Sequence, residues 1–173
     1  FYDGRRLDSY LRGVRGWLES LPTEDRMAAS FVYAGADGGR VADALNATPL
    51  PCTVRIMGFL SIQDFAQLAD QSFANSYLAL SVTFHHKLLE LLARGRPVIC
   101  YPSERTEGKE LASRSGTLFL SCGTSSELQD AIATAWSIRN RDNRKAELPA
   151  WRWRDFAQEL GRFFQGFPQR DSE

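Results

Sequence analysis

Lys87 and Glu90 are the two residues whose types and spacing best suit binding chemistry. They lie three positions apart in the segment 84–94, where apolar side chains recur at helical spacing, so both should fall on one face of a helix. A carboxylate here can accept hydrogen bonds from both hydroxyls of a ribose, and a lysine one turn earlier can meet phosphates. A surface ion pair of Glu90 with Lys87 or Arg94 explains the same residues equally well. The residues alone leave both interpretations open.

A glycine-rich turn provides a second candidate site. Gly35, Gly38 and Gly39 follow the apolar run 28–34, and Arg40 comes next, at the start of an expected helix. Glycine lets the backbone approach a ligand closely, and the N-terminus of a helix favours anions, to which Arg40 adds a full positive charge. Taken alone, the turn is better explained as an ordinary strand-to-helix connection.

Several familiar catalytic and cofactor-binding signatures are absent from the sequence. Gly108 and Lys109 are followed by Glu110, not by the Ser or Thr with which a phosphate-binding loop holds magnesium. The glycine turn lacks the Gly-x-Gly-x-x-Gly spacing of dinucleotide-binding proteins. His86 and Glu90 could touch one metal ion, but two ligands do not make a metal site. We therefore expect no metal and no cofactor, and we assign no catalytic residue.

Short apolar runs alternate with amphipathic segments along the chain. The expected strands are 28–34, 53–57, 76–80, 97–101 and 117–120. The expected helices are 5–21, 40–46, 62–70, 84–94, 108–114, 125–138 and 151–164. This alternation predicts an α/β fold, a doubly wound, Rossmann-like parallel sheet of about five or six strands with helices on both faces. Ligands of such a sheet bind at the carboxyl ends of the strands, where the expected loops are 35–40, 58–62, 81–84, 101–108 and 121–125.

The composition indicates one compact domain. The chain has 173 residues, is 43% hydrophobic, and carries 21 basic and 21 acidic side chains. Zero net charge argues against nucleic acid as a partner, and the longest charge-free stretch, 71–86, is too short and too polar to span a bilayer. The three cysteines, Cys52, Cys100 and Cys122, show no metal-binding spacing and should be reduced, mostly buried thiols of a cytoplasmic protein.

The segment 87–99, Lys-Leu-Leu-Glu-Leu-Leu-Ala-Arg-Gly-Arg-Pro-Val-Ile, resembles a motif of one enzyme family. It is similar to the carboxy-terminal, nucleotide-sugar-binding domain of GT-B glycosyltransferases of the group 1, glycogen-synthase-like kind. Further similar blocks follow in the family's order over about residues 30–165. They are 54–58, 79–81, 108–112, 116–119, 127–132 and the segment that begins at Trp151.

The resemblance implies that the domain holds a nucleoside diphosphate sugar. Glu90 would match the family's ribose-binding glutamate, and Lys87 and Arg40 would lie near the diphosphate. The remaining nucleotide-sugar-binding residues would be Gly35, Ser81 and Thr83 around the phosphates and Gly58 and Phe59 at the base. The sequence departs from the family at Val82, where the motif has its first glutamate, and after the first strand, where Arg40 stands without the usual lysine.

The implied activity is that of a retaining, metal-independent glycosyltransferase that makes a polysaccharide or glycolipid. Because the chain begins at Phe1 without an initiator Met, we expect it to be part of a longer protein whose N-terminal domain binds the acceptor. This part alone should bind the donor and catalyse nothing. The alternatives are a catalytically degenerate nucleotide-binding or interaction module of the same fold and an unrelated doubly wound domain.

The resemblance also suggests how the chain is organised. Residues 1–25 would be a helix and linker from the preceding domain, and 26–138 the nucleotide-sugar-binding domain. A linker at 139–150, a C-terminal helix at 151–167 and a frayed tail at 168–173 would follow. We expect a cytoplasmic protein without a transmembrane segment, and attachment of the full-length protein to the inner face of the membrane stays open.

Overall fold

The computed structural model describes residues 4–79 and 86–140 of the chain. The helices in this part are α1 (Gly4–Ser20), α2 (Thr23–Ala28), α3 (Gly38–Ala47), α4 (Ile62–Gln71), α5 (His86–Leu92), α6 (Thr106–Arg114) and α7 (Ser125–Ser137). The strands are β1 (Ser30–Tyr33), β2 (Thr53–Ile56), β3 (Asn75–Leu78), β4 (Val98–Tyr101) and β5 (Phe119–Ser121). Within these residues, no helix combines the length and the apolar character that crossing a membrane requires.

The alternation of strands and helices predicted from the sequence is confirmed for the described residues. Each expected strand or helix is present, with its ends shifted by a few residues, and Gly95 ends the α5 segment with a φ of 69°, as expected of a glycine after a helix. The short helix α2 was not predicted. The expected C-terminal helix 151–167, the tail 168–173 and nearly all of the linker 139–150 lie outside the described residues.

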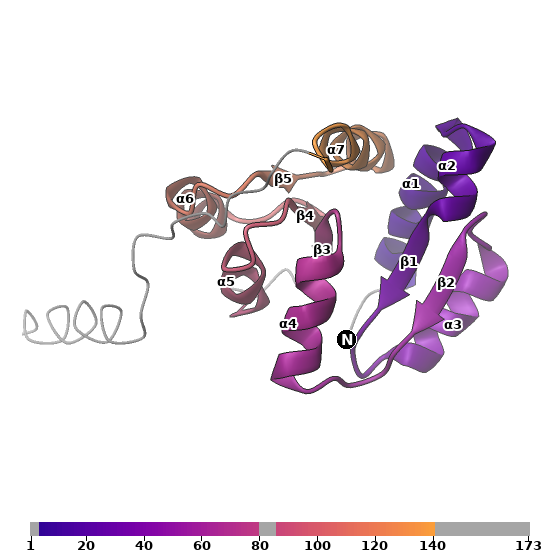
Figure 1. The fold of residues 1–173 in the computed structure, drawn as a ribbon, viewed down its shortest axis with the longest axis horizontal. Helices are drawn as coiled ribbons and strands as arrows, with labels where there is room; N and C mark the ends of the chain where they lie inside the picture. The colour runs from indigo at the N-terminus through magenta and orange to yellow at the C-terminus, as the bar shows by residue number, and fades with distance from the viewer. Residues whose placement is uncertain (1–3, 80–85, 141–173) are drawn as a thin grey trace, which may run out of the picture.

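The five described strands form two parallel sheets, so the prediction of one sheet of about five or six strands is wrong. One sheet pairs β1 with β2, and the other has the order β3-β4-β5 (Figure 1). In the first sheet Ser30 pairs with Thr53, and in the second Asn75 pairs with Val98. Strands of three or four residues offer few backbone groups for pairing, and an apolar run predicts a strand without predicting its neighbours.

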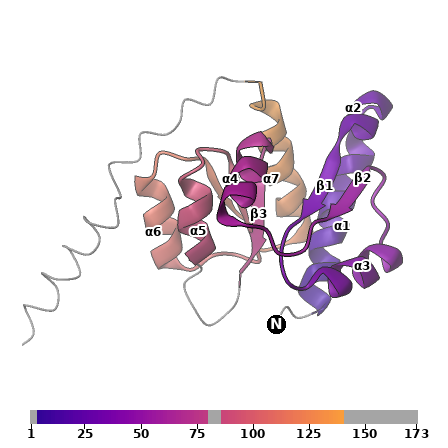
Figure 2. The same ribbon diagram turned by 60° about the horizontal axis from the view of Figure 1, so that its bottom comes forward.

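The three-stranded sheet has helices on both faces, as predicted. Alternate residues of β4, which is buried throughout, point to opposite sides. Val98 and Cys100 pack with α4, α5 and α6, whereas Ile99 and Tyr101 pack with α1 and α7. Figure 2 shows α4, α5 and α6 on one side of β3 and α7 on the other. The sheet is therefore the middle layer of three.

Among the described residues, helices pack on one face of the two-stranded sheet. Phe31, Tyr33 and Val54 pack against the core that α1 and α3 share. The alternate residues Thr53 and Arg55 are exposed. Val32 pairs with Arg55 and shares this second face. Because the expected C-terminal helix lies outside the described residues, the presence of helices on both faces of this sheet stays a prediction.

Helix α1 joins the two sheets into one core. The ring of Tyr10 lies 6.5 Å from that of Phe31 on β1 and 6.1 Å from that of Tyr101 on β4, and a hydrogen bond of 2.5 Å joins its hydroxyl to Ser76 on β3. Figure 1 shows α1 running beside α7 and behind β1. Helix α1 thus shares its hydrophobic core with residues 26–138. That it comes from a preceding domain stays a prediction.

Two glycines of α1 provide a matched test of how closely α1 packs on α7. A Cβ on the buried Gly13 would lie 2.8 Å from Leu128 Cδ2 and 3.0 Å from the backbone oxygen of Ser125, whereas a Cβ on Gly16 would meet only the flexible end of Gln129. Both alanine substitutions gain about 1 kcal/mol of helix propensity, but overpacking at Gly13 costs ~1–3 kcal/mol. We expect Gly13→Ala to unfold at lower urea concentration than Gly16→Ala, by about 2 kcal/mol in unfolding free energy. Equal stability of the two variants would contradict this packing.

Candidate functional site

The carboxyl ends of β1 and β2 are joined by a hydrogen bond between their following loops. Because the strands are parallel, Gly35 and Gly58 follow them at the same edge of the sheet, and the Gly35 N–H donates to the Gly58 carbonyl at 2.7 Å. A Cβ at position 35 would lie 2.7 Å from the hydroxyl oxygen of Tyr33, which accepts a hydrogen bond from the Asp37 N–H. Gly58 has a φ of 65°, which strongly favours glycine. Two of the residues expected in the site are thus in direct contact.

The helix that follows β1 begins at this contact. Helix α3 starts at Gly38, and its first turn contains the exposed Arg40. The side chain of the N-cap residue, Asp37, makes no capping hydrogen bond. The amides at the start of α3 therefore follow the Gly35–Gly58 contact by a few residues along the chain, and amides at a helix N-terminus favour anions.

The loop after β2 exposes large apolar side chains. Phe59 is 86% exposed and Ile62 is 84% exposed, and Met57 is also exposed. Ser61 fixes the end of the loop, because its hydroxyl oxygen accepts a hydrogen bond from the Asp64 N–H at 3.1 Å and so caps α4. The Phe59 ring, next to Gly58, has a free face on which a planar group could stack.

Helix α5 buries three of its four leucines and exposes Lys87 and Glu90. Leu88, Leu91 and Leu92 pack in the core beneath the three-stranded sheet. Lys87 and Glu90 are both exposed. The Lys87 Nζ lies 5.3 Å from the centre of the Phe65 ring on α4, a cation–π distance.

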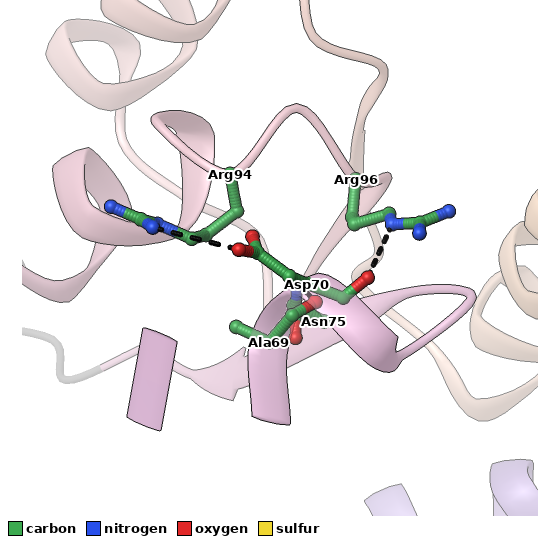
Figure 3. A network of polar contacts seen from close by, with 5 residues as sticks. All are labelled: Ala69, Asp70, Asn75, Arg94 and Arg96. Atoms are coloured by element: carbon green, nitrogen blue, oxygen red, sulfur yellow. Dashed lines mark hydrogen bonds and ion pairs between the residues drawn. The ribbon is translucent and has the colours of Figure 1, made fainter. Parts of the chain in front are cut away.

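The surface ion pair considered for Glu90 does not form among the described residues. Arg94 Nη1 instead lies 3.8 Å from a carboxylate oxygen of Asp70, and Arg96 Nε donates to the Asp70 carbonyl at 2.8 Å (Figure 3). Figure 3 also shows Asn75, whose amide donates to the carbonyl of Ala69 at 3.1 Å. These contacts hold the end of α4 against the turn before β4, and they leave the Glu90 carboxylate without an ion pair in this part of the chain.

The expected site is therefore assembled only in part. Gly35 and Gly58 are in contact, with Phe59 and Arg40 close to them along the chain. Within the described ranges, no hydrogen bond joins Glu90 or Lys87 to the glycine loops. Ser81 and Thr83, and Val82 between them, lie outside the described residues.

A buried carboxylate at the carboxyl ends of β3, β4 and β5 was missed by the sequence analysis. Glu104 is only 8% exposed, and its carboxylate accepts hydrogen bonds from the Tyr77 hydroxyl, the Arg105 N–H at 2.8 Å and the Cys100 thiol at 3.9 Å. The Glu104 N–H donates to the Ser121 hydroxyl at 2.9 Å. The one local signal is Gly108, where a Cβ would lie 2.5 Å from Glu104 Cγ, so only glycine fits there.

The chemistry of the buried thiols follows from their surroundings. Burial, with further contributions from nearby acidic groups, raises the pKa of Cys100 to about 12 and that of Cys122 to about 11. Both thiols are therefore protonated at neutral pH and are poor nucleophiles. All three cysteines are free, as predicted, and Cys52 is only partly buried.

Comparisons with known proteins assign no family. The chain matches no protein-family model and no curated protein sequence. In the part of the chain that the structure describes, no three His, Cys, Asp or Glu side chains are grouped so as to hold a metal ion. Any function must therefore be argued from the site itself and from the motif at 87–99.

Proposed function

We propose that this chain is the donor-binding domain of a glycosyltransferase and holds a nucleoside diphosphate sugar at the carboxyl ends of its strands. The observation that carries the proposal is the hydrogen bond between Gly35 and Gly58. It joins the turn suited to a diphosphate with the loop suited to a base. In parallel α/β sheets this edge is where nucleotides bind.

Each part of the donor has a chemical counterpart in the chain. Backbone amides at the start of α3 and the Arg40 guanidinium would hold the diphosphate. The exposed ring of Phe59 would stack on the base, since aromatic side chains stack on any base. Glu90 would accept hydrogen bonds from the ribose hydroxyls, and Lys87 would lie near the phosphates.

The proposed reaction needs little chemistry from this domain. When the sugar leaves its nucleotide, negative charge grows on the departing diphosphate, and helix N-termini and cations stabilise that charge. Neither a protein nucleophile nor a metal is required for this role. A further domain would bind the acceptor, and the chain alone would bind the donor without transferring it.

The resemblance favours one further candidate, a nucleotide-binding module of the same fold that has lost catalysis. The motif's first glutamate is replaced by Val82, so its contact to the sugar would be missing. Sugar transfer by the longer protein, with an acceptor supplied, separates this candidate from an active transferase.

Thermal unfolding with UDP, GDP and ADP tests nucleotide binding directly. A ligand at about 100 times its dissociation constant stabilises the folded state by ~2.7 kcal/mol, which raises the melting temperature of a domain of this size by about 5–10 °C. We expect this shift with one of the three nucleotides, and we expect it to persist in EDTA. If none of the three raises the melting temperature, the chain is not a nucleotide-binding domain of this kind.

A further inference from the structure

Arg6 lies at the junction of the two sheets. Its Nη1 donates to the carbonyl of Ala79 at 3.2 Å, and Ala79 is the residue that follows β3. Tyr10, one helical turn further along α1, contacts Phe31 on β1 and hydrogen-bonds to Ser76 on β3. Arg6 is therefore on the same side of α1 as Tyr10, toward the carboxyl ends of β1 and β3.

At this junction the direction in which strands are added reverses, although β1 and β3 belong to separate sheets. From β1 the chain passes through α3 to β2 on one side, and the later strands β3, β4 and β5 form the other sheet. Both views show that β1, and not β2, is the strand nearer to β3 (Figures 1 and 2). In parallel α/β folds, ligands bind outside the carboxyl ends of the strands at such a reversal.

Among the described residues, no acidic side chain forms an ion pair with Arg6. The side chain is half-buried, and the described residues give it one hydrogen bond, to a neutral carbonyl, and no ion pair. A guanidinium has five N–H donors in a planar arrangement that matches two oxygens of a phosphate. A partly buried cation without a counter-charge, at an edge suited to phosphates, is complementary to an anionic ligand.

We propose that Arg6 binds the diphosphate of the nucleotide donor as a second cation beside Arg40. This inference rests on the proposed function and assigns a role to a helix that precedes the motif-bearing part of the chain. The site would then hold phosphate groups with cations from two helices, α3 and α1, which share one core.

Dissociation constants of UDP, GDP and ADP, and of the matching nucleosides, test the role of Arg6 in the 173-residue chain. For the nucleotide that binds, we expect Arg6→Gln to weaken the diphosphate about tenfold and to leave nucleoside binding unchanged. The loss should be larger at low than at high ionic strength, because salt screens the lost charge, and Arg6→Lys should restore part of it. Arg12→Gln is the matched control, because Arg12 is an exposed arginine of the same helix whose one hydrogen bond among the described residues is to Ser9.

The outcomes separate this inference from the proposed function. If the unchanged chain binds a nucleoside diphosphate and Arg6→Gln binds it equally well, Arg6 is not a phosphate ligand and the proposed function stands. An equal loss of diphosphate and nucleoside affinity would show a purely structural role and also overturn the inference. If the unchanged chain binds none of the three, both proposals are wrong.

A second measurement needs no variant and so does not depend on the folding of Arg6→Gln. Phenylglyoxal modifies accessible arginines, and mass spectrometry locates the modified residues. We expect the nucleoside diphosphate to protect Arg6 and to leave Arg12 as reactive as before. Modification of Arg6 at the same rate with and without the bound nucleotide would overturn the inference.

Discussion

Glu104→Ala is expected to lower the free energy of unfolding by about 3 kcal/mol. The substitution removes the acceptor of the Tyr77 hydroxyl, the Cys100 thiol and the Arg105 N–H, and it leaves a cavity beside Gly108. A buried donor without a partner costs ~1–3 kcal/mol, and a cavity adds to this cost. Urea unfolding followed by circular dichroism measures the change.

Two further variants separate the network around Glu104 from a general effect of losing a charge. Tyr77→Phe removes the hydroxyl that donates to the carboxylate and also interacts with the Cys100 thiol, and it should cost about 1–2 kcal/mol. Glu110→Ala removes an exposed carboxylate from the same helix region and should stay within about 0.5 kcal/mol of the unchanged chain. If Glu104→Ala is as stable as Glu110→Ala, Glu104 does not hold the ends of β3, β4 and β5 together.

Glu90→Ala is expected to weaken nucleoside diphosphate binding by about 10- to 100-fold. A hydrogen bond to a charged acceptor contributes ~1.5–3 kcal/mol, and Glu90 is the proposed acceptor of the ribose hydroxyls. Because the side chain is exposed and has no ion pair among the described residues, its loss should leave the unliganded melting temperature unchanged. Calorimetric titration measures the affinity.

The control for Glu90 is the exposed Glu110, which lies on α6 and has no proposed contact with the donor. Glu110→Ala should bind the nucleotide as tightly as the unchanged chain does. Equal affinities of Glu90→Ala and Glu110→Ala would assign the ribose contact to another residue.

Local signals in the sequence were sufficient to predict most of the elements. The leucines of α5 and the wholly apolar β4 give clear patterns, because burial of one helical face leaves apolar residues at helical spacing and burial of both faces of a strand leaves a continuous apolar run. Helix α2 was missed, since its six residues are too few for a period, although Glu24 and Asp25 in its first turn suit a helix N-terminus.

The arrangement of the sheets could not be predicted in the same way. The strands of both sheets are three or four residues long, and no local signal says that β1 pairs with β2 but not with β3. Tyr10 of α1 contacts β1, β3 and β4 together, and such contacts join residues far apart in the chain. Pairing is decided by this tertiary packing rather than by propensity.

In the candidate site, too, residues with a local sequence signal were predicted and residues with distant partners were not. Gly35 and Gly58 were found because glycines after apolar runs mark the ends of strands, and the parallel pairing of β1 and β2 brings them together. Glu104 and Arg6 were missed because their partners are distant: Tyr77 is 27 residues from Glu104, and Ala79 is 73 residues from Arg6. Charged residues in such contacts look like ordinary surface charges in the sequence.

The central claim is that the Glu90 carboxylate holds the ribose of a bound nucleotide. Paired titrations with the ribonucleoside diphosphate and its 2′-deoxy analogue test this claim most directly. For the unchanged chain we expect the ribonucleotide to bind about tenfold more tightly, because the analogue lacks one of the hydroxyls that donate to the carboxylate. For Glu90→Ala we expect the ribonucleotide and its 2′-deoxy analogue to bind equally, since the carboxylate that accepts from the 2′-hydroxyl is gone. Equal affinities in the unchanged chain, or a preference for ribose that persists in Glu90→Ala, would contradict the claim.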